Sequence, residues 1–134
     1  MATRSRIALQ LNTEALLSVY HHWDGYPQWL GVTLKKKFNT REKVEELIDG
    51  GDISCCDSDT NWDREKCEPH VQYYNDRGEK TEPRLDLNDE DFFADGEEYA
   101  YIFESNGKWV CYDLHYSEPQ LKSIPSTYPK ELAS

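Results

Sequence analysis

Alternating apolar and polar residues predict a hairpin at the start of the chain. In residues 5–12, Ile7, Leu9 and Leu11 would share one face, which is the pattern of a half-buried strand. Residues 16–22 follow after a short turn and are rich in residues that favour strands. Two such runs so close together in sequence indicate antiparallel neighbours.

Helical spacing replaces this alternation in the next part of the chain. Apolar residues recur every four positions in residues 28–38, which predicts a helix whose last turn is rich in lysine. Thr40 is a suitable N-cap for a second helix over residues 40–49, and Gly50 and Gly51 would end it. Because so few residues connect the two helices, we expect them to form a compact pair.

The second half of the chain contains shorter signals. Residues 70–74 favour a short strand, and residues 88–93 favour one helical turn. Residues 98–104 and 108–114 alternate again on either side of Asn-Gly at positions 106–107, the strongest hairpin signal in the chain.

Together these elements predict an α+β fold, with an antiparallel sheet of about four or five strands and two helices packed on one face. The 134 residues fit a single domain. We expect this domain to span residues 1–116, with an acidic insertion at about residues 49–98 and an irregular C-terminal tail over residues 117–134. Within the insertion, residues 52–69 are hydrophilic and are also expected to be irregular.

Charge is distributed unevenly along the chain. Residues 49–98 contain 17 of the 26 acidic residues but only five of the 15 basic ones, so this segment carries the whole negative excess. Direct nucleic-acid binding is disfavoured, because it depends on Lys and Arg that neutralise phosphates. The favoured partner is a protein with a basic surface or nucleic-acid-binding groove. Since the sequence contains neither a ~20-residue apolar run nor a signal peptide, we expect no membrane partner and a cytoplasmic location.

Residues 22–27 form the motif His-Trp-Asp-Gly-Tyr-Pro. Together with Met-Ala-Thr-Arg-Ser at the start, Gly-Asp-Ile-Ser at 51–54, Asp-Arg-Gly-Glu at 76–79 and Glu-Tyr-Ala-Tyr-Ile-Phe at 98–103, it resembles a family of small, mostly uncharacterised bacteriophage and prophage proteins. The similarity covers most of residues 1–113. It implies a phage-encoded accessory protein in the cytoplasm of a bacterial host, where such proteins often disable host enzymes or immune systems.

The motif offers candidate site residues. His22 and Asp24 are weak candidates for a general base and the carboxylate that assists it. With Trp23 and Tyr26, they are also candidates for lining a ligand pocket. We favour a structural interpretation, in which Trp23 and Tyr26 pack under the helix pair and Asp24 caps a helix, because no nucleophile accompanies the motif. We therefore lean against an enzymatic function.

Cys56, Cys67 and His70 form a candidate metal site. The two-residue gap between Cys67 and His70 lets both side chains reach one ion, and zinc favours such sulfur and nitrogen ligands. The alternative is a set of free thiols and no cofactor, as a reducing cytoplasm would allow. Cys55, Cys56 and Cys67 depart from the pattern of the phage family, so any role for them would be particular to this chain.

The acidic segment has two interpretations. It is either a solvated face that supports solubility, or a surface whose carboxylates imitate nucleic-acid phosphates and occupy a basic groove. The residues expected to form the contact surface are Asp86, Asp89, Glu90, Asp91 and Asp95.

The leading hypothesis from the sequence is a phage-encoded inhibitor of a host protein or defence complex, similar in action to an anti-CRISPR protein. It would act by occlusion, without turnover. The alternative is a small-ligand, nucleotide-sequestering or zinc-binding domain. Its pocket would lie beside His22, and Lys35 or Arg41 would supply positive charge.

Overall fold

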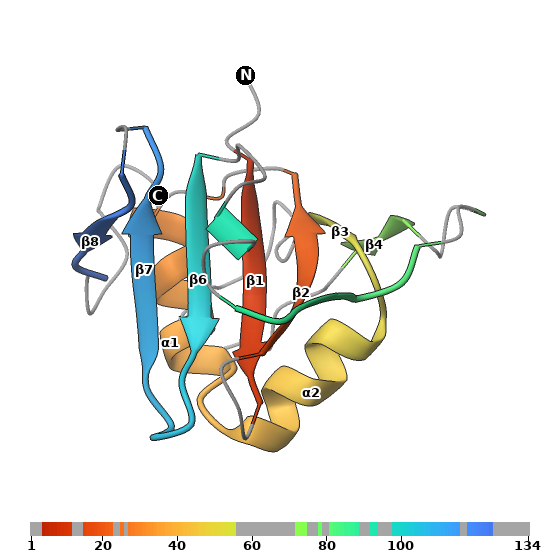
Figure 1. Ribbon diagram of the computed structural model, residues 1–134. Helices are drawn as coiled ribbons and strands as arrows, with labels where there is room; N and C mark the ends of the chain where they lie inside the picture. The colour runs from red at the N-terminus through yellow and green to blue at the C-terminus, as the bar shows by residue number, and fades with distance from the viewer. Residues whose placement is uncertain are drawn as a thin grey trace, which may run out of the picture.

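The structure, a computed structural model, describes residues 4–11, 15–22, 25, 27–55, 72–74, 78, 81–88, 92–93, 98–115 and 118–124. These residues form an α+β fold, as expected, in which strands build one sheet and two α-helices pack against it (Figure 1). The expectation of an antiparallel sheet of four or five strands is wrong in both respects. The sheet is mixed, and the described residues contribute eight strands to it.

The strands occur in the order β4-β3-β2-β1-β6-β7-β8, and β5 also pairs with β2. Their bounds are β1 Ser5–Gln10, β2 Leu16–His21, β3 Ile53–Cys55, β4 Gln72–Tyr73, β5 Arg84–Asp86, β6 Tyr99–Phe103, β7 Trp109–Asp113 and β8 Gln120–Lys122. The outer side of β2 is therefore shared, because β5 pairs with its first half and β3 with its last residue.

Two pairs of strands run parallel, and this is the main departure from the sequence-based expectation. The connection from β2 to β3 passes through the helix pair, and a helical crossover of this kind brings the chain back in the same direction. The second parallel pair is β1 with β6, which enters the sheet after the long central segment. Both hairpins are antiparallel as predicted, and Gly107 closes the β6–β7 turn with a φ of 84°.

The predicted helix pair is present, with a different beginning. Residues Pro27–Gly31 form one π-helical turn, which continues into α1, Val32–Lys37. The second helix, α2, is Arg41–Asp49, and the Thr40 hydroxyl accepts a hydrogen bond from the Lys43 N–H at 3.3 Å, as an N-cap does.

The sheet has an apolar core on each face. On one face, residues of β1, β2, β6 and β7 pack against both helices, which confirms that the two helices lie on the same side of the sheet. The opposite face forms a smaller core of Ala8, Leu16, Ala100, Ile102 and Phe92. Phe92 and Phe93, the described helical residues of the turn predicted at residues 88–93, pack in this smaller core on the sheet (Figure 1).

Two short strands lie where irregular structure was expected, and a third lies where no strand was predicted. β3 falls within residues 52–69, β5 lies in the acidic insertion, and β8 lies in the tail at 117–134. The tail is therefore not wholly irregular, because β8 pairs with β7. Within the described ranges, the helices lack the length and apolar character needed to cross a membrane.

Candidate functional site

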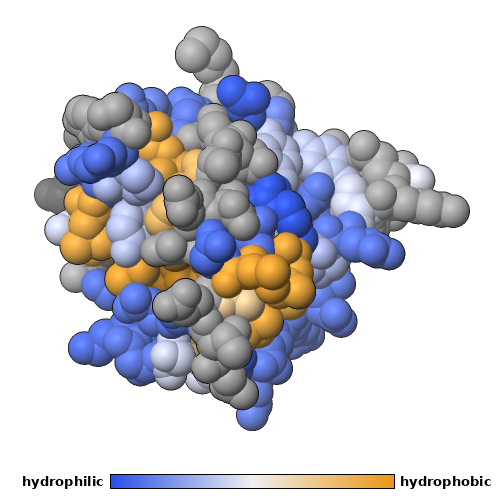
Figure 2. All heavy atoms as spheres, viewed as in Figure 1, coloured by the Kyte–Doolittle hydropathy of each residue, from blue (hydrophilic) through white to orange (hydrophobic). Residues whose placement is uncertain are grey.

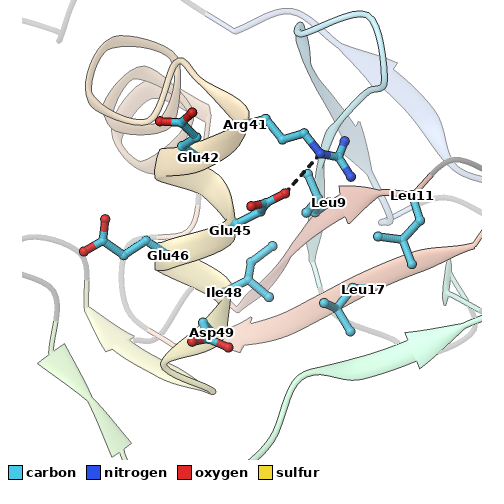
Figure 3. A pocket seen from close by; sticks show the side chains of 9 residues that line it. All are labelled: Leu9, Leu11, Leu17, Arg41, Glu42, Glu45, Glu46, Ile48 and Asp49. Atoms are coloured by element: carbon cyan, nitrogen blue, oxygen red, sulfur yellow. Dashed lines mark hydrogen bonds and ion pairs between the residues drawn. The ribbon is translucent and has the colours of Figure 1, made fainter.

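A hollow of about 560 Å³ opens between α2 and the β1–β2 hairpin (Figure 3). We call it the α2 groove. It is lined by Leu9, Leu11, Leu17, Arg41, Glu42, Glu45, Glu46, Ile48 and Asp49. Its volume lies within the roughly 300–1,000 Å³ that is usual for binding sites in proteins.

The floor of the groove is apolar. Alternation along β1 places Leu9 and Leu11 on the helix-bearing face of the sheet, and Leu17 on β2 shares that face. Ile48 belongs to the buried stripe of α2 and meets them from above. In Figure 3 these four side chains point into the space between the helix and the strands.

The rim of the groove is acidic. Glu42, Glu45, Glu46 and Asp49 occupy positions i, i+3, i+4 and i+7 of α2, so they form a single stripe along the helix. We call these four residues the acidic stripe. All four are exposed, and Figure 3 shows Glu45 directed toward the strands and Glu46 directed away from them.

Part of the stripe is unfavourable for the helix that carries it, although Glu42 lies in the favourable first turn and Glu45 pairs with Arg41. Two like-charged pairs stand four residues apart, and each destabilises an isolated helix by about 0.2–0.5 kcal/mol. Asp49 also lies at the C-terminal end of α2, where the helix dipole disfavours a negative charge. The positions of Glu46 and Asp49 are thus not explained by the stability of α2.

Arg41 is the only cation among the described residues that line the groove. Its Nε donates to Glu45 Oε1 at 3.1 Å, and its Nη1 donates to the Gln10 carbonyl at 3.2 Å. The guanidinium thus joins the start of α2 to the end of β1. It neutralises one member of the stripe and leaves the lining negative overall.

Of the residues predicted to form the acidic contact surface, Asp86 is the one that the structure describes. It lies on β5, only 12% of its side chain is exposed, and it accepts a hydrogen bond from Arg84 Nε at 2.9 Å. Its carboxylate is therefore engaged within the fold. Asp89, Glu90, Asp91 and Asp95 lie outside the described residues.

Among the described residues, a row of exposed carboxylates lies on α2, a helix that was predicted from its apolar stripe alone. Its signal was present in the sequence, since the spacing of Glu42, Glu45, Glu46 and Asp49 defines one helical face.

The histidines at the end of β2 face opposite sides, as a strand requires. His22 Nδ1 lies 2.6 Å from the Tyr20 hydroxyl, and the two rings pack at 5.8 Å. Trp23, Asp24 and Tyr26 lie outside the described residues, so the proposed partnership of His22 and Asp24 stays a prediction. Gly25, within the same motif, accepts a hydrogen bond from the Tyr101 hydroxyl at 2.6 Å.

His21 is buried in the core opposite Ser5 of β1. Within the described part of the chain, neither of its ring nitrogens has a hydrogen-bond partner, and the same holds for the Ser5 hydroxyl. Burial, with a smaller contribution from the neighbouring charge of His22, lowers the pKa of His21 to about 3. A neutral imidazole with 1% of its surface exposed is out of reach of any substrate, so we assign it no catalytic role.

A second polar cluster lies where β6 begins and β7 ends. His115 Nδ1 is 2.6 Å from Asp113 Oδ1, and His115 Nε2 is 3.3 Å from Glu98 Oε1. The hydrogen bonds of His115 raise its pKa, and the bond to Asp113 contributes more than the bond to Glu98. Burial acts to raise the pKa of Asp113, but its hydrogen bonds with His115 outweigh this and leave it lowered. Glu98 also accepts from the Arg4 N–H, so the cluster ties three strands together.

Cysteine chemistry is limited in the described part of the chain. Cys111 is a buried free thiol, and burial raises its pKa to about 12, which suppresses the reactive thiolate. Cys56, Cys67 and His70 lie outside the described residues, so zinc binding stays a prediction. The described residues contain no group of three or more His, Cys, Asp or Glu placed to hold a metal ion.

No protein-family model, curated protein or solved structure matches the chain.

Proposed function

We propose that the protein is a phage-encoded accessory protein that inhibits a host protein or defence complex, in the manner of an anti-CRISPR protein. It acts by binding and occlusion, without turnover. Its acidic face imitates the backbone of a nucleic acid and occupies a basic groove of the partner.

The acidic stripe on α2 carries this proposal. Its four carboxylates lie within eight residues, from 42 to 49, which is about 10 Å of helix axis. Arg41 neutralises Glu45, so three uncompensated charges remain, about one for each 5 Å of axis, compared with one phosphate per ~3.4 Å along a strand of B-DNA. A groove built to hold phosphates therefore meets a row of negative charges on α2.

The unfavourable placement of these carboxylates supports the same function. The repulsion between the carboxylates of the stripe falls when a cationic surface covers them. Attraction of this kind steers the encounter, speeds association and weakens as salt is added. The central acidic segment adds to the long-range field of the molecule.

The experiment expresses the protein in a bacterium whose CRISPR complex restricts a lytic phage, and counts plaques. The wild-type protein is expected to restore plaque formation, and E46K/D49K is expected to lose this effect. Matched stability of the two proteins in urea shows that the loss comes from the surface. Unchanged inhibition by E46K/D49K would overturn the mimicry mechanism.

The alternative, a small-ligand or nucleotide-sequestering domain, has less support. Arg41, which would supply positive charge, already pairs with Glu45. Four carboxylates around the α2 groove would repel a phosphorylated ligand.

A further inference from the structure

A row of leucines crosses three neighbouring strands beside the α2 groove. Leu9 of β1 is in register with Leu17 of β2, and Leu17 is in register with Leu85 of β5. Residues directly opposite each other in antiparallel strands project on the same face of the sheet. The three leucines therefore form one apolar strip on the face that carries α2. We call it the leucine row.

Exposure increases along the leucine row. Leu9 is buried, Leu17 is half-buried and Leu85 is 55% exposed. Leu87 follows two residues further along the chain and is 71% exposed. Figure 2, which looks onto the face of the sheet opposite the helices, shows apolar atoms at the surface in the area of β5. The helix α2 thus covers one end of the strip and leaves the other end accessible to a partner.

The backbone geometry indicates how a partner would use this strip. Leu16, Leu17 and Ser18 already pair with β5, so a partner segment cannot add to β2 as a strand there. It must contact the leucine side chains. The step from Leu17 to Leu85 is about 5 Å, the distance between adjacent strands. That distance matches the spacing of side chains three or four residues apart on a helix.

The charges beside the strip select the partner. Four carboxylates and one paired guanidinium border the apolar floor. A segment that offers leucine-like side chains to the floor and Lys or Arg to the acidic stripe satisfies both features at once. We propose that the α2 groove and the leucine row bind a basic amphipathic helix of the partner protein. This inference rests on the proposed function and specifies the contact surface.

The test uses a defined probe, a fluorescein-labelled peptide of about 18 residues made of Leu and Lys, long enough to form a helix. The leucines recur at i, i+3, i+4 and i+7, so that they form one face. A control peptide has the same composition in an order that gives no apolar face. Fluorescence anisotropy measures the Kd of each peptide at two salt concentrations.

The amphipathic peptide is expected to bind at least about tenfold more tightly than the reordered peptide. L85D and E46K should each weaken it by about tenfold or more, because one removes an apolar contact and the other a charge pair. The control variants L121D and E118K alter an exposed leucine and an exposed glutamate at β8, away from α2. They should leave the Kd unchanged.

Equal affinity for both peptides would overturn the inference, because it would show attraction to net charge alone. Unchanged binding by L85D would overturn it as well. If neither peptide binds while E46K/D49K still abolishes inhibition in cells, the helix proposal fails and the proposed function stands. If the amphipathic peptide binds as expected but E46K/D49K inhibits normally, the groove assignment stands and the proposed function fails.

Discussion

The buried His21 makes a sharp prediction about acid stability. In the unfolded chain its imidazole takes up a proton near pH 6.5, whereas in the folded protein its pKa is about 3. Between these values the unfolded state binds more protons than the folded state. The free energy of unfolding must therefore fall as the pH falls through this window.

The magnitude follows from the width of the window. It spans about 3.5 pH units, and each unit is worth about 1.4 kcal/mol for one proton, so the whole loss is about 5 kcal/mol. Of this loss in the free energy of unfolding, about 3 kcal/mol is expected between pH 7 and pH 4. A typical domain is stable by about 5–15 kcal/mol, so His21 alone has a large influence on the acid limit of this fold.

The variant H21L removes the titrating group and keeps an apolar side chain in the core. Because the ring nitrogens of His21 have no hydrogen-bond partner among the described residues, the substitution removes no hydrogen bond to them. Urea unfolding followed by tryptophan fluorescence gives the free energy of unfolding at pH 7, 6, 5 and 4. The wild-type protein should lose about 3 kcal/mol more than H21L between pH 7 and pH 4.

The difference between the two proteins isolates His21, because both contain the same carboxylates. Parallel loss of stability in wild type and H21L would refute the reasoning. A histidine signal from position 21 that titrates above pH 5 in NMR spectra would also contradict a buried, neutral imidazole.

Three further predictions concern local features of the fold. The pKa of His115, which is 47% exposed, is raised, so its contribution to stability is present below pH 6.5 and fades as the pH rises through the folded-state pKa. H115Q should therefore lower the free energy of unfolding in urea by less than about 1 kcal/mol at pH 6 and leave it unchanged at pH 9. T40A should lower the free energy of unfolding by about 1 kcal/mol, measured in urea, because it removes the N-cap of α2. G50A should cost about 1–3 kcal/mol, seen as a lower Tm, because the added Cβ would overlap the ring of Tyr73, whose hydroxyl bonds the Leu47 carbonyl.

Local features of the fold could be predicted because they depend on neighbouring residues. Thr40 caps α2 through an N–H three residues away, and Gly107 closes a turn within four residues. The pairing of β1 with β6 joins residues 94 positions apart, as in the contact of Arg4 with Glu98, and no local pattern indicates it. Alternation correctly predicted both strands, but it does not indicate which strands are neighbours in the sheet.

The short strands were missed for a different reason. β5 contains a single apolar residue, Leu85, and becomes a strand because β2 offers it a free edge. The carboxylates of α2 were not predicted as a surface because net charge is a sum over the chain, whereas a surface depends on which residues share a face. The predicted contact surface at Asp89, Glu90, Asp91 and Asp95 stays a prediction, because these residues lie outside the described ranges. Asp86 contributes to the sum and is paired with Arg84, while Glu46 stands exposed on α2.

The acidic stripe can be tested without weakening the fold. In E46K/D49K, each new lysine stands four residues after Glu42 or Glu45, which converts two repulsive pairs into attractive ones. A lysine at position 49 also complements the helix dipole. The free energy of unfolding of the double variant should therefore exceed that of wild type by about 0.5–1 kcal/mol.

The most direct measurement compares plaque formation in CRISPR-protected bacteria that express wild type, E46K/D49K or E118K/Q120K/S123K. The last variant adds the same positive charge at exposed positions around β8. Wild type and the β8 variant should restore plaques equally, and E46K/D49K should restore none while unfolding at an equal or higher urea concentration. Full inhibition by E46K/D49K would contradict a function carried by the acidic stripe.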